Sequence, residues 1–244
     1  MTPIALVAAA VGVVTWAQRG AVGPAEAGVL ATAKLALRVR EHVALCAVST
    51  ALAVATAVPA GVAATRPGLR RLAPPLLFLA NVGQSVPTIA VLALAFSVTG
   101  IGFRTAVIGL WAYSLLPVLR NTVAGLAGVD PAVVEAARGM GMSPIQVLLR
   151  VELPLAWPVV MAGIRTAAVV NVGTAALATF VGAGGLGALI TVGLDNQRDR
   201  ILYTGAGLTA LLALTVDWAI GTLAEFTGPN RRSFTGMQRK TNAS

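Results

Sequence analysis

The chain has 244 residues, of which 57% are apolar and 11% carry a charge. Soluble globular proteins carry charge on about 25% of their residues, so this composition excludes a soluble domain, and its hydrophobicity excludes a disordered chain. The single Cys46 and the single His42 argue against a disulfide and against a Cys- or His-ligated metal site, so no metal is expected. The net charge of +9 comes from basic residues between and after apolar stretches, which indicates orientation in a membrane rather than nucleic-acid binding.

Charge-poor stretches predict the membrane-spanning helices, because a span needs about 20 apolar residues. They cover residues 42–65, 72–103, 105–124, 155–194 and 201–224. Arg120, Arg165 and Asp217 are the only charged residues inside them. We therefore expect an all-α, polytopic bundle with five core spans.

Residues 1–41 form a separate N-terminal region. Residues 3–17 are apolar, but a helix of this length rises only about 22 Å, less than the ~30 Å core of a bilayer. No Lys or Arg precedes Arg19, so the basic region of a secretory signal is missing. We expect a short, retained first span, with a cleaved signal or an interfacial segment as alternatives, and then an amphipathic extracytoplasmic helix over residues 27–41.

The basic residues favour a cytoplasmic position for the loop around residues 126–152. Alternation of the spans then leaves ten basic residues inside and seven outside, and long translocated segments count for less in this bias. The tail over residues 229–244 is short, basic and polar, and we expect it to be disordered on the cytoplasmic side.

The loop over residues 130–154 carries the most specific pattern of the chain. Asp130 followed by Pro131 predicts the start of a helix. Gly139 and Gly141 then interrupt that helix, and Ser143-Pro144-Ile145-Gln146 has the pattern of a capping box that starts another. The sequence predicts two short helices joined by a glycine elbow, for which an ordinary surface helix pair is the plainer interpretation.

The same loop resembles the cytoplasmic coupling loop of ABC-importer permeases. That signature is Glu-Ala-Ala, three residues, Gly, nine residues, Ile, one residue and Leu-Pro. The chain matches it except for Val151 in place of Ile, and the implied coupling residues are Glu135, Ala136, Ala137, Gly139, Gly141, Leu153 and Pro154. The resemblance implies that the loop docks on a separate ATP-hydrolysing subunit and passes its movement to the membrane helices.

Three shorter motifs resemble permeases for compatible solutes. They are Gln84-Ser85-Val86-Pro87, Gly163-Ile164-Arg165-Thr166-Ala167 and the glycine-rich run from Phe180 to Gly187. The resemblance covers roughly residues 42–228 and implies glycine betaine, choline, carnitine or proline as the solute. It also implies a bacterial cell-membrane location, membrane lipid around the chain, a second permease copy or paralogue, and an extracytoplasmic solute-binding lipoprotein.

The chain itself is expected to catalyse no reaction and to hold no cofactor. It has no Gly-x-x-x-x-Gly-Lys-[Ser/Thr] motif, so ATP would be used by the separate subunit. Gly182, Gly184 and Gly187 satisfy Gly-x-Gly-x-x-Gly, but a dinucleotide fingerprint follows a strand and precedes a distant acidic residue. Here the glycines follow an apolar helix, so we interpret them as a tight extracytoplasmic turn at which a binding protein could dock.

Four polar or aromatic residues are candidates for the translocation path. A quaternary amine favours aromatic faces and acceptor oxygens, and Gln84, Trp111, Tyr113 and Asn171 are candidates by residue type alone. Packing or interfacial anchoring explains each of them equally well.

Arg165 and Asp217 are the charges expected to pair inside the membrane. Each lies about 16 Å from the cytoplasmic end of its span at 1.5 Å per residue, so the two fall at similar depth. A charge there costs about 2.5–3.5 kcal/mol or more, which an opposite charge on the next helix offsets in part. The alternative is that Arg165 snorkels and Asp217 bonds locally.

Two other functions stay open from the sequence. One is an importer for another small solute, such as an amino acid. The other is a transporter that works without ATP, which would need intramembrane ionisable groups for ion coupling. Only Arg165 and Asp217 would serve that purpose, and no inverted repeat is visible.

Overall fold

The computed structural model describes residues 3–20 and 23–228, and within these ranges all regular structure is helical. The predicted disordered tail at 229–244 lies outside the described residues. The α-helices are α1 (Pro3–Arg19), α2 (Pro24–Val29), α3 (Thr32–Thr65), α4 (Ala73–Ser85), α5 (Thr88–Thr99), α6 (Phe103–Ala127), α7 (Pro131–Gly139), α8 (Pro144–Val147), α9 (Leu153–Thr174), α10 (Gly187–Asp195) and α11 (Asp199–Thr227). Short 3-10 helices cover Arg70–Leu72 and Ala175–Val181, and a π-helical turn covers Leu148–Glu152.

The expected all-α membrane bundle is confirmed. Three single helices, α3, α6 and α11, and the continuous stretch Pro144–Val181 are each long and apolar enough to cross a membrane. The segments Arg70–Ser85 and Thr88–Thr99 pass the same test only as a pair, and the two are bent by 98° relative to each other, as in a broken span or a re-entrant loop. α1 is an apolar helix of 17 residues, and its crossing of the membrane stays a prediction.

The stretch at residues 72–103, expected to hold one span, forms the two helices α4 and α5. Pro87 forces the residue before it out of the helical region, and Val86 is extended at φ −77° and ψ 130°. The Tyr113 hydroxyl of α6 lies 3.1 Å from the carbonyl oxygens of both Gln84 and Val86. This donor satisfies backbone groups that the break leaves without helical partners.

The prediction of a separate surface helix over residues 27–41 is wrong. α2 ends at Val29, and α3 then runs unbroken from Thr32 to Thr65, through Pro59. Lys34, Arg38 and Arg40 therefore lie in the first three turns of the spanning helix itself. No proline between Thr32 and Pro59 interrupts its hydrogen bonding. The span expected at 155–194 ends earlier, at Val181, since three glycines with positive φ, Gly182, Gly184 and Gly185, separate it from α10.

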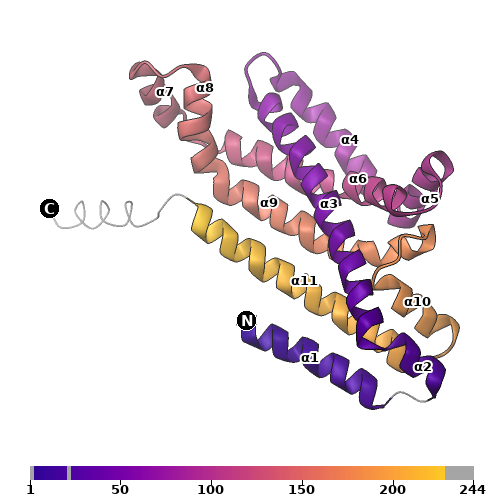
Figure 1. Ribbon diagram of the computed structural model, residues 1–244. Coiled ribbons are helices and arrows are strands. Elements are labelled where there is room, and N and C mark those ends of the chain that lie inside the picture. Colours follow the sequence, from indigo (N-terminus) through magenta and orange to yellow (C-terminus); the bar gives the residue numbers. More distant parts are fainter. Residues whose placement is uncertain (1–2, 21–22, 229–244) are drawn as a thin grey trace.

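The centre of the bundle is formed by α3, α6 and α9, with α11 packed on α9 and α1 packed on α11 (Figure 1). Small residues allow the close approach that membrane helix packing favours. At Gly163 on α9, an added Cβ would lie 2.7 Å from the Pro117 carbonyl oxygen of α6. The α6–α9 contact therefore depends on the absence of a side chain at this position.

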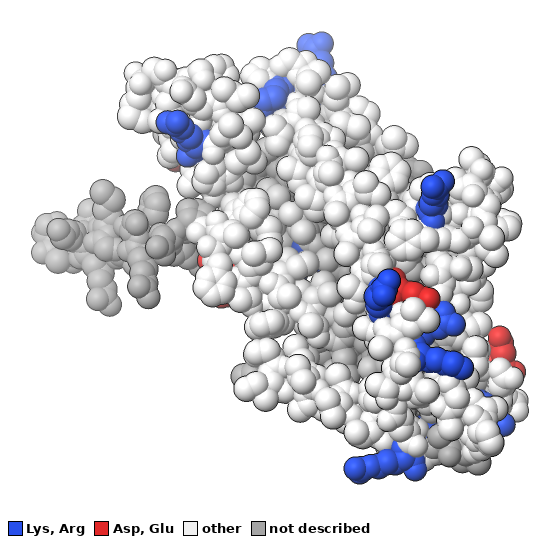
Figure 2. Space-filling model, viewed as in Figure 1, with Lys and Arg blue, Asp and Glu red and all other residues white. Residues whose placement is uncertain are grey.

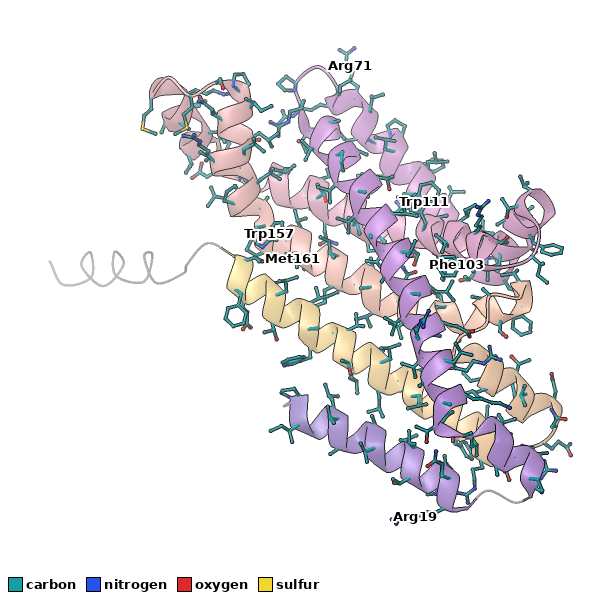
Figure 3. The ribbon with its side chains drawn as sticks, viewed as in Figure 1. Arg19, Arg71, Phe103, Trp111, Trp157 and Met161 are labelled. Carbon is teal, nitrogen blue, oxygen red and sulfur yellow. The ribbon has the colours of Figure 1, made fainter. Side chains whose placement is uncertain are left out.

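The helical bundle has two distinct ends. Helices α7 and α8 project beside the turn between α3 and α4, and α2 and α10 lie at the other end (Figure 1). Arg71 and Arg19 mark these opposite ends in Figure 3. Charges gather toward the ends, and the middle of the face in Figure 2 carries few of them. The charge-poor middle is the part expected to lie in the bilayer, and which end faces the cytoplasm stays a prediction.

Candidate coupling site and polar sites between the spans

The loop between α6 and α9 folds as the sequence predicts. Asp130 caps α7 by accepting a hydrogen bond from the Ala132 N–H at 2.9 Å, and Pro131 is the first helical residue. Gly141 has a φ of 83° and forms the elbow. Ser143 and Gln146 then form the predicted capping box at the start of α8. Capped helices on either side of a fixed elbow make this loop a rigid projection.

The exposed surface of the projection is unusually apolar for a loop. Met140, Ile145 and Leu149 have exposed fractions of 71%, 66% and 58%. Glu135 and Ala136 are exposed beside them, and Gly139 lies on the same helix, whereas Ala137 is buried. An exposed apolar patch on a loop outside the membrane-spanning helices is typical of a protein-binding surface.

The projection continues into the membrane helices without a flexible joint. α8 leads through the π-helical turn Leu148–Glu152 directly into α9. Because Pro154 has no N–H, the helical hydrogen bond to Arg150 is lost, and the preceding turn is the widened one. Leu153 packs against the buried cluster of Leu126, Ala156 and Val160. A displacement of α8 would therefore be carried into α9.

A second connection joins the coupling loop to α3, and sequence reasoning missed it. Arg66 Nη2 and Glu152 Oε2 form an ion pair at 2.6 Å, and the Glu152 side chain is only 10% exposed. Arg66 also donates to the Val62 carbonyl and the Thr65 hydroxyl at the end of α3. A cavity of about 460 Å³ lies beside this pair, between the coupling loop and the α3–α4 turn, and Glu135 lines it. No local pattern joins residues 66 and 152, so only the fold reveals the contact.

At the other end, the glycine-rich turn is held on α3. Glu41 Oε2 accepts the Gly185 N–H at 2.9 Å, and His42 Nδ1 accepts the Leu186 N–H at 3.2 Å. His42 Nε2 lies 2.9 Å from the Val172 carbonyl, so the proton resides on Nε2. The predicted tight turn is confirmed, and its docking of a binding protein stays a prediction. Glu41 and His42 gave no signal in the sequence.

The four candidates for the translocation path do not form one site. Gln84 donates to the Tyr113 carbonyl at 3.0 Å, at the α4–α5 break. Trp111 donates to the Thr56 hydroxyl of α3 at 3.0 Å. Asn171 is fully buried and donates to Ser49 and Thr50, also on α3. Each side chain joins two helices, and a role for any of them in the path remains a prediction.

Arg165 and Asp217 do come together. The guanidinium of Arg165 donates from Nε to Oδ1 and from Nη2 to Oδ2 of Asp217, both at 2.5 Å. The pair connects α9 to α11 with the bidentate geometry of strong charge-assisted hydrogen bonds. Both side chains remain partly exposed, at 45% and 39%. Among the described residues, no group of His, Cys, Asp and Glu could hold a metal ion.

The bundle and its capped projection define a class of protein, a polytopic helical membrane protein with a rigid apolar projection at one end. Residues 57–226 match the family of binding-protein-dependent transport system inner membrane components. The chain belongs to this family and is a multi-pass permease subunit of an ABC importer in the cell membrane.

Several relatives are similar over most of their length. The choline transport system permease OpuBB of Bacillus subtilis is 37% identical over 84% of this chain and 92% of that protein. The osmoprotectant import permease OsmY of Salmonella typhimurium is 43% identical over 73% of this chain and 75% of the relative. The carnitine transport permease OpuCD of Listeria monocytogenes is 42% identical over 74% of this chain and 80% of the relative.

A solved structure shares the fold. An inward-facing structure of the MetNI methionine ABC transporter aligns with a TM-score of 0.70 and 25% identity. The alignment covers 80% of this chain and 96% of the compared chain.

Proposed function

We propose that this permease imports a compatible solute, namely glycine betaine, carnitine, choline or proline, from a solute-binding lipoprotein outside the cell. The observation that carries the proposal is the identity of 36–43% to permeases named for osmoprotectants, choline, carnitine and glycine betaine. The chain would bind no cofactor and catalyse no reaction, because ATP would be hydrolysed by a separate subunit.

The mechanism follows from the rigid coupling loop. The apolar surface around Met140 and Ile145 would sit in a cleft of the ATPase, with Glu135 and Ala136 at the contact. Closure of the ATPase dimer would then move α8 and α9 together through the continuous helix, and α3 through Arg66 and Glu152. The helices would alternate between outward-open and inward-open arrangements, with the ATPase shifting the population between them.

A second permease subunit, identical or paralogous, would complete the path, since one bundle supplies half of it. The helices α4 and α5 leave a broad apolar surface for lipid or for this second subunit. Its most exposed residues are Phe78, Leu79, Leu94 and Val98.

Uptake in proteoliposomes tests the proposal. The permease would be reconstituted with its ATPase and binding protein, and ATP-dependent uptake of radiolabelled glycine betaine, carnitine, choline and proline would be measured. We expect uptake of at least one of them, and none when the ATPase is omitted.

Similarity to the methionine transporter favours one alternative, an importer for an amino acid. Uptake of methionine or another proteinogenic amino acid other than proline, with no uptake of the four compatible solutes, would support this alternative. Uptake without the ATPase would instead indicate a secondary transporter.

A further inference from the structure

The Arg165–Asp217 pair lies deep in the membrane and is nevertheless open on one side. Arg165 is about 18 Å along α9 from Leu153, and Asp217 is about 15 Å from the end of α11 at Thr227. The side chains keep exposed fractions of 45% and 39%. Charges at such depth face protein or a water-filled cavity rather than lipid, so the open side of the pair points to one of these.

The apolar surface of α9 and α11 lies on a different side of these helices. An apolar groove of about 460 Å³ runs between α3, α9 and α11, and Ile164, Ala168 and Val216 line it. Arg165 instead shares an exposed strip of α9 with Ala162 and Thr166, at the i, i+3 and i+4 spacing of one helix face. The strip is distinct from the groove, and it carries the charged pair.

The seat of the guanidinium is formed by a glycine. A Cβ at Gly221 on α11 would lie 3.2 Å from Arg165 Nη1, so glycine lets the guanidinium lie against this helix. Nε and Nη2 are bonded to Asp217, and Nη1 has no hydrogen bond to any residue that the structure describes. The pair thus presents free donors on the cation and free lone pairs on the carboxylate at one surface.

We propose that Arg165 and Asp217 form a contact point for a zwitterionic solute on the cytoplasmic half of the translocation path. The carboxylate of the solute accepts hydrogen bonds from the guanidinium, and its ammonium group lies beside Asp217. The solute supplies both opposite charges, so neither residue is stranded while the pair opens. A cation without a carboxylate leaves Arg165 without an anion. This inference rests on the proposed function, because it requires a solute that carries both charges.

Thiol labelling tests whether the strip faces water. In a Cys46→Ser background, Thr166→Cys would be compared with Val216→Cys, which faces the apolar groove. The assembled importer would be treated with a membrane-impermeant methanethiosulfonate, both without nucleotide and with ATP. We expect labelling at residue 166 and none at residue 216. Absence of labelling at residue 166 in both states would overturn the proposal.

Solute selectivity tests the charge recognition. The variant Arg165→Gln/Asp217→Asn removes both charges with little change in volume. We expect its uptake of glycine betaine and carnitine to fall about tenfold further than its uptake of choline, the scale of one charge-assisted contact. Arg165→Lys keeps the positive charge and should retain more zwitterion uptake than Arg165→Gln.

The outcomes separate this inference from the proposed function. An equal loss for all three solutes, at normal membrane abundance and with normal stimulation of the ATPase, would make the pair a structural clasp and overturn the inference alone. Wild-type uptake of choline without any zwitterion would also overturn the inference alone. A wild-type importer that carries none of the compatible solutes would overturn the proposed function.

Discussion

Gly141 is required by backbone conformation rather than by packing. Gly141 adopts a φ of 83° at the coupling elbow, where an added Cβ would find open space. Strain at this position is therefore conformational and not steric. A non-glycine residue in this region costs roughly 1–2 kcal/mol, and asparagine bears the conformation better than other side chains.

This conformation predicts the ranking of substitutions at Gly141. We expect Gly141→Leu to insert into the membrane but to uncouple ATP hydrolysis from uptake, whereas Gly141→Asn should retain most of the uptake. Uptake and ATPase activity would be measured in the same proteoliposomes. Normal uptake by Gly141→Leu would show that the elbow is not needed for docking.

Gly163 presents the opposite case, because its restriction is steric. An added Cβ would lie 2.5 Å from Asn121 Cβ and 2.7 Å from the Pro117 carbonyl oxygen, whereas one at Gly173 on the same helix meets nothing within 4 Å. We expect Gly163→Ala to cost about 1–3 kcal/mol by overpacking and Gly173→Ala to be close to neutral. Thermal unfolding of the purified permease would measure both, and equal melting temperatures would contradict the close contact of α6 and α9.

At the scale of elements, the Arg66–Glu152 pair joins α3 to the coupling segment. Glu152 is the more buried partner, at 10% exposure against 31% for Arg66. Removing Arg66 alone strands a mostly buried carboxylate, which costs more than removing the pair. We therefore expect Arg66→Ala to be less stable than Arg66→Ala/Glu152→Ala, with a difference on the order of 1–3 kcal/mol.

The double variant then isolates the role of the pair in coupling. It should fold but respond to the ATPase with reduced uptake for each ATP hydrolysed, since α3 has lost its connection to the loop. Thermal unfolding and the ratio of uptake to hydrolysis would be measured together. A normal ratio in the stable double variant would restrict the pair to a structural role.

Local signals predicted the elements that depend on neighbouring residues. The caps at Asp130 and Ser143 and the elbow at Gly141 each follow from a few adjacent side chains, and all are present. The bend at Pro87 was not predicted, because apolar composition gives the length of a hydrophobic stretch and not its direction. Contacts such as Glu41 with Gly185 join distant segments, and a single sequence gives no information about such pairs.

At the scale of the whole molecule, the depth of Arg165 and Asp217 could be predicted, but their contact could not. Depth follows from the rise per residue along two helices that run in opposite directions. Contact depends also on the rotation of each helix about its axis, which is set by packing against other helices, as where Gly163 lies against α6.

The orientation of the bundle makes a last prediction about the whole chain. The coupling loop and the turn between α10 and α11 lie at opposite ends of the bundle (Figure 1). In a Cys46→Ser background, we expect Met142→Cys to react with an impermeant maleimide only from the cytoplasmic side and Asn196→Cys only from outside. Both sites are exposed or partly exposed loop positions, so access to reagent depends on their side of the membrane. The reverse labelling pattern would invert the topology and would place the coupling loop where no ATPase could reach it.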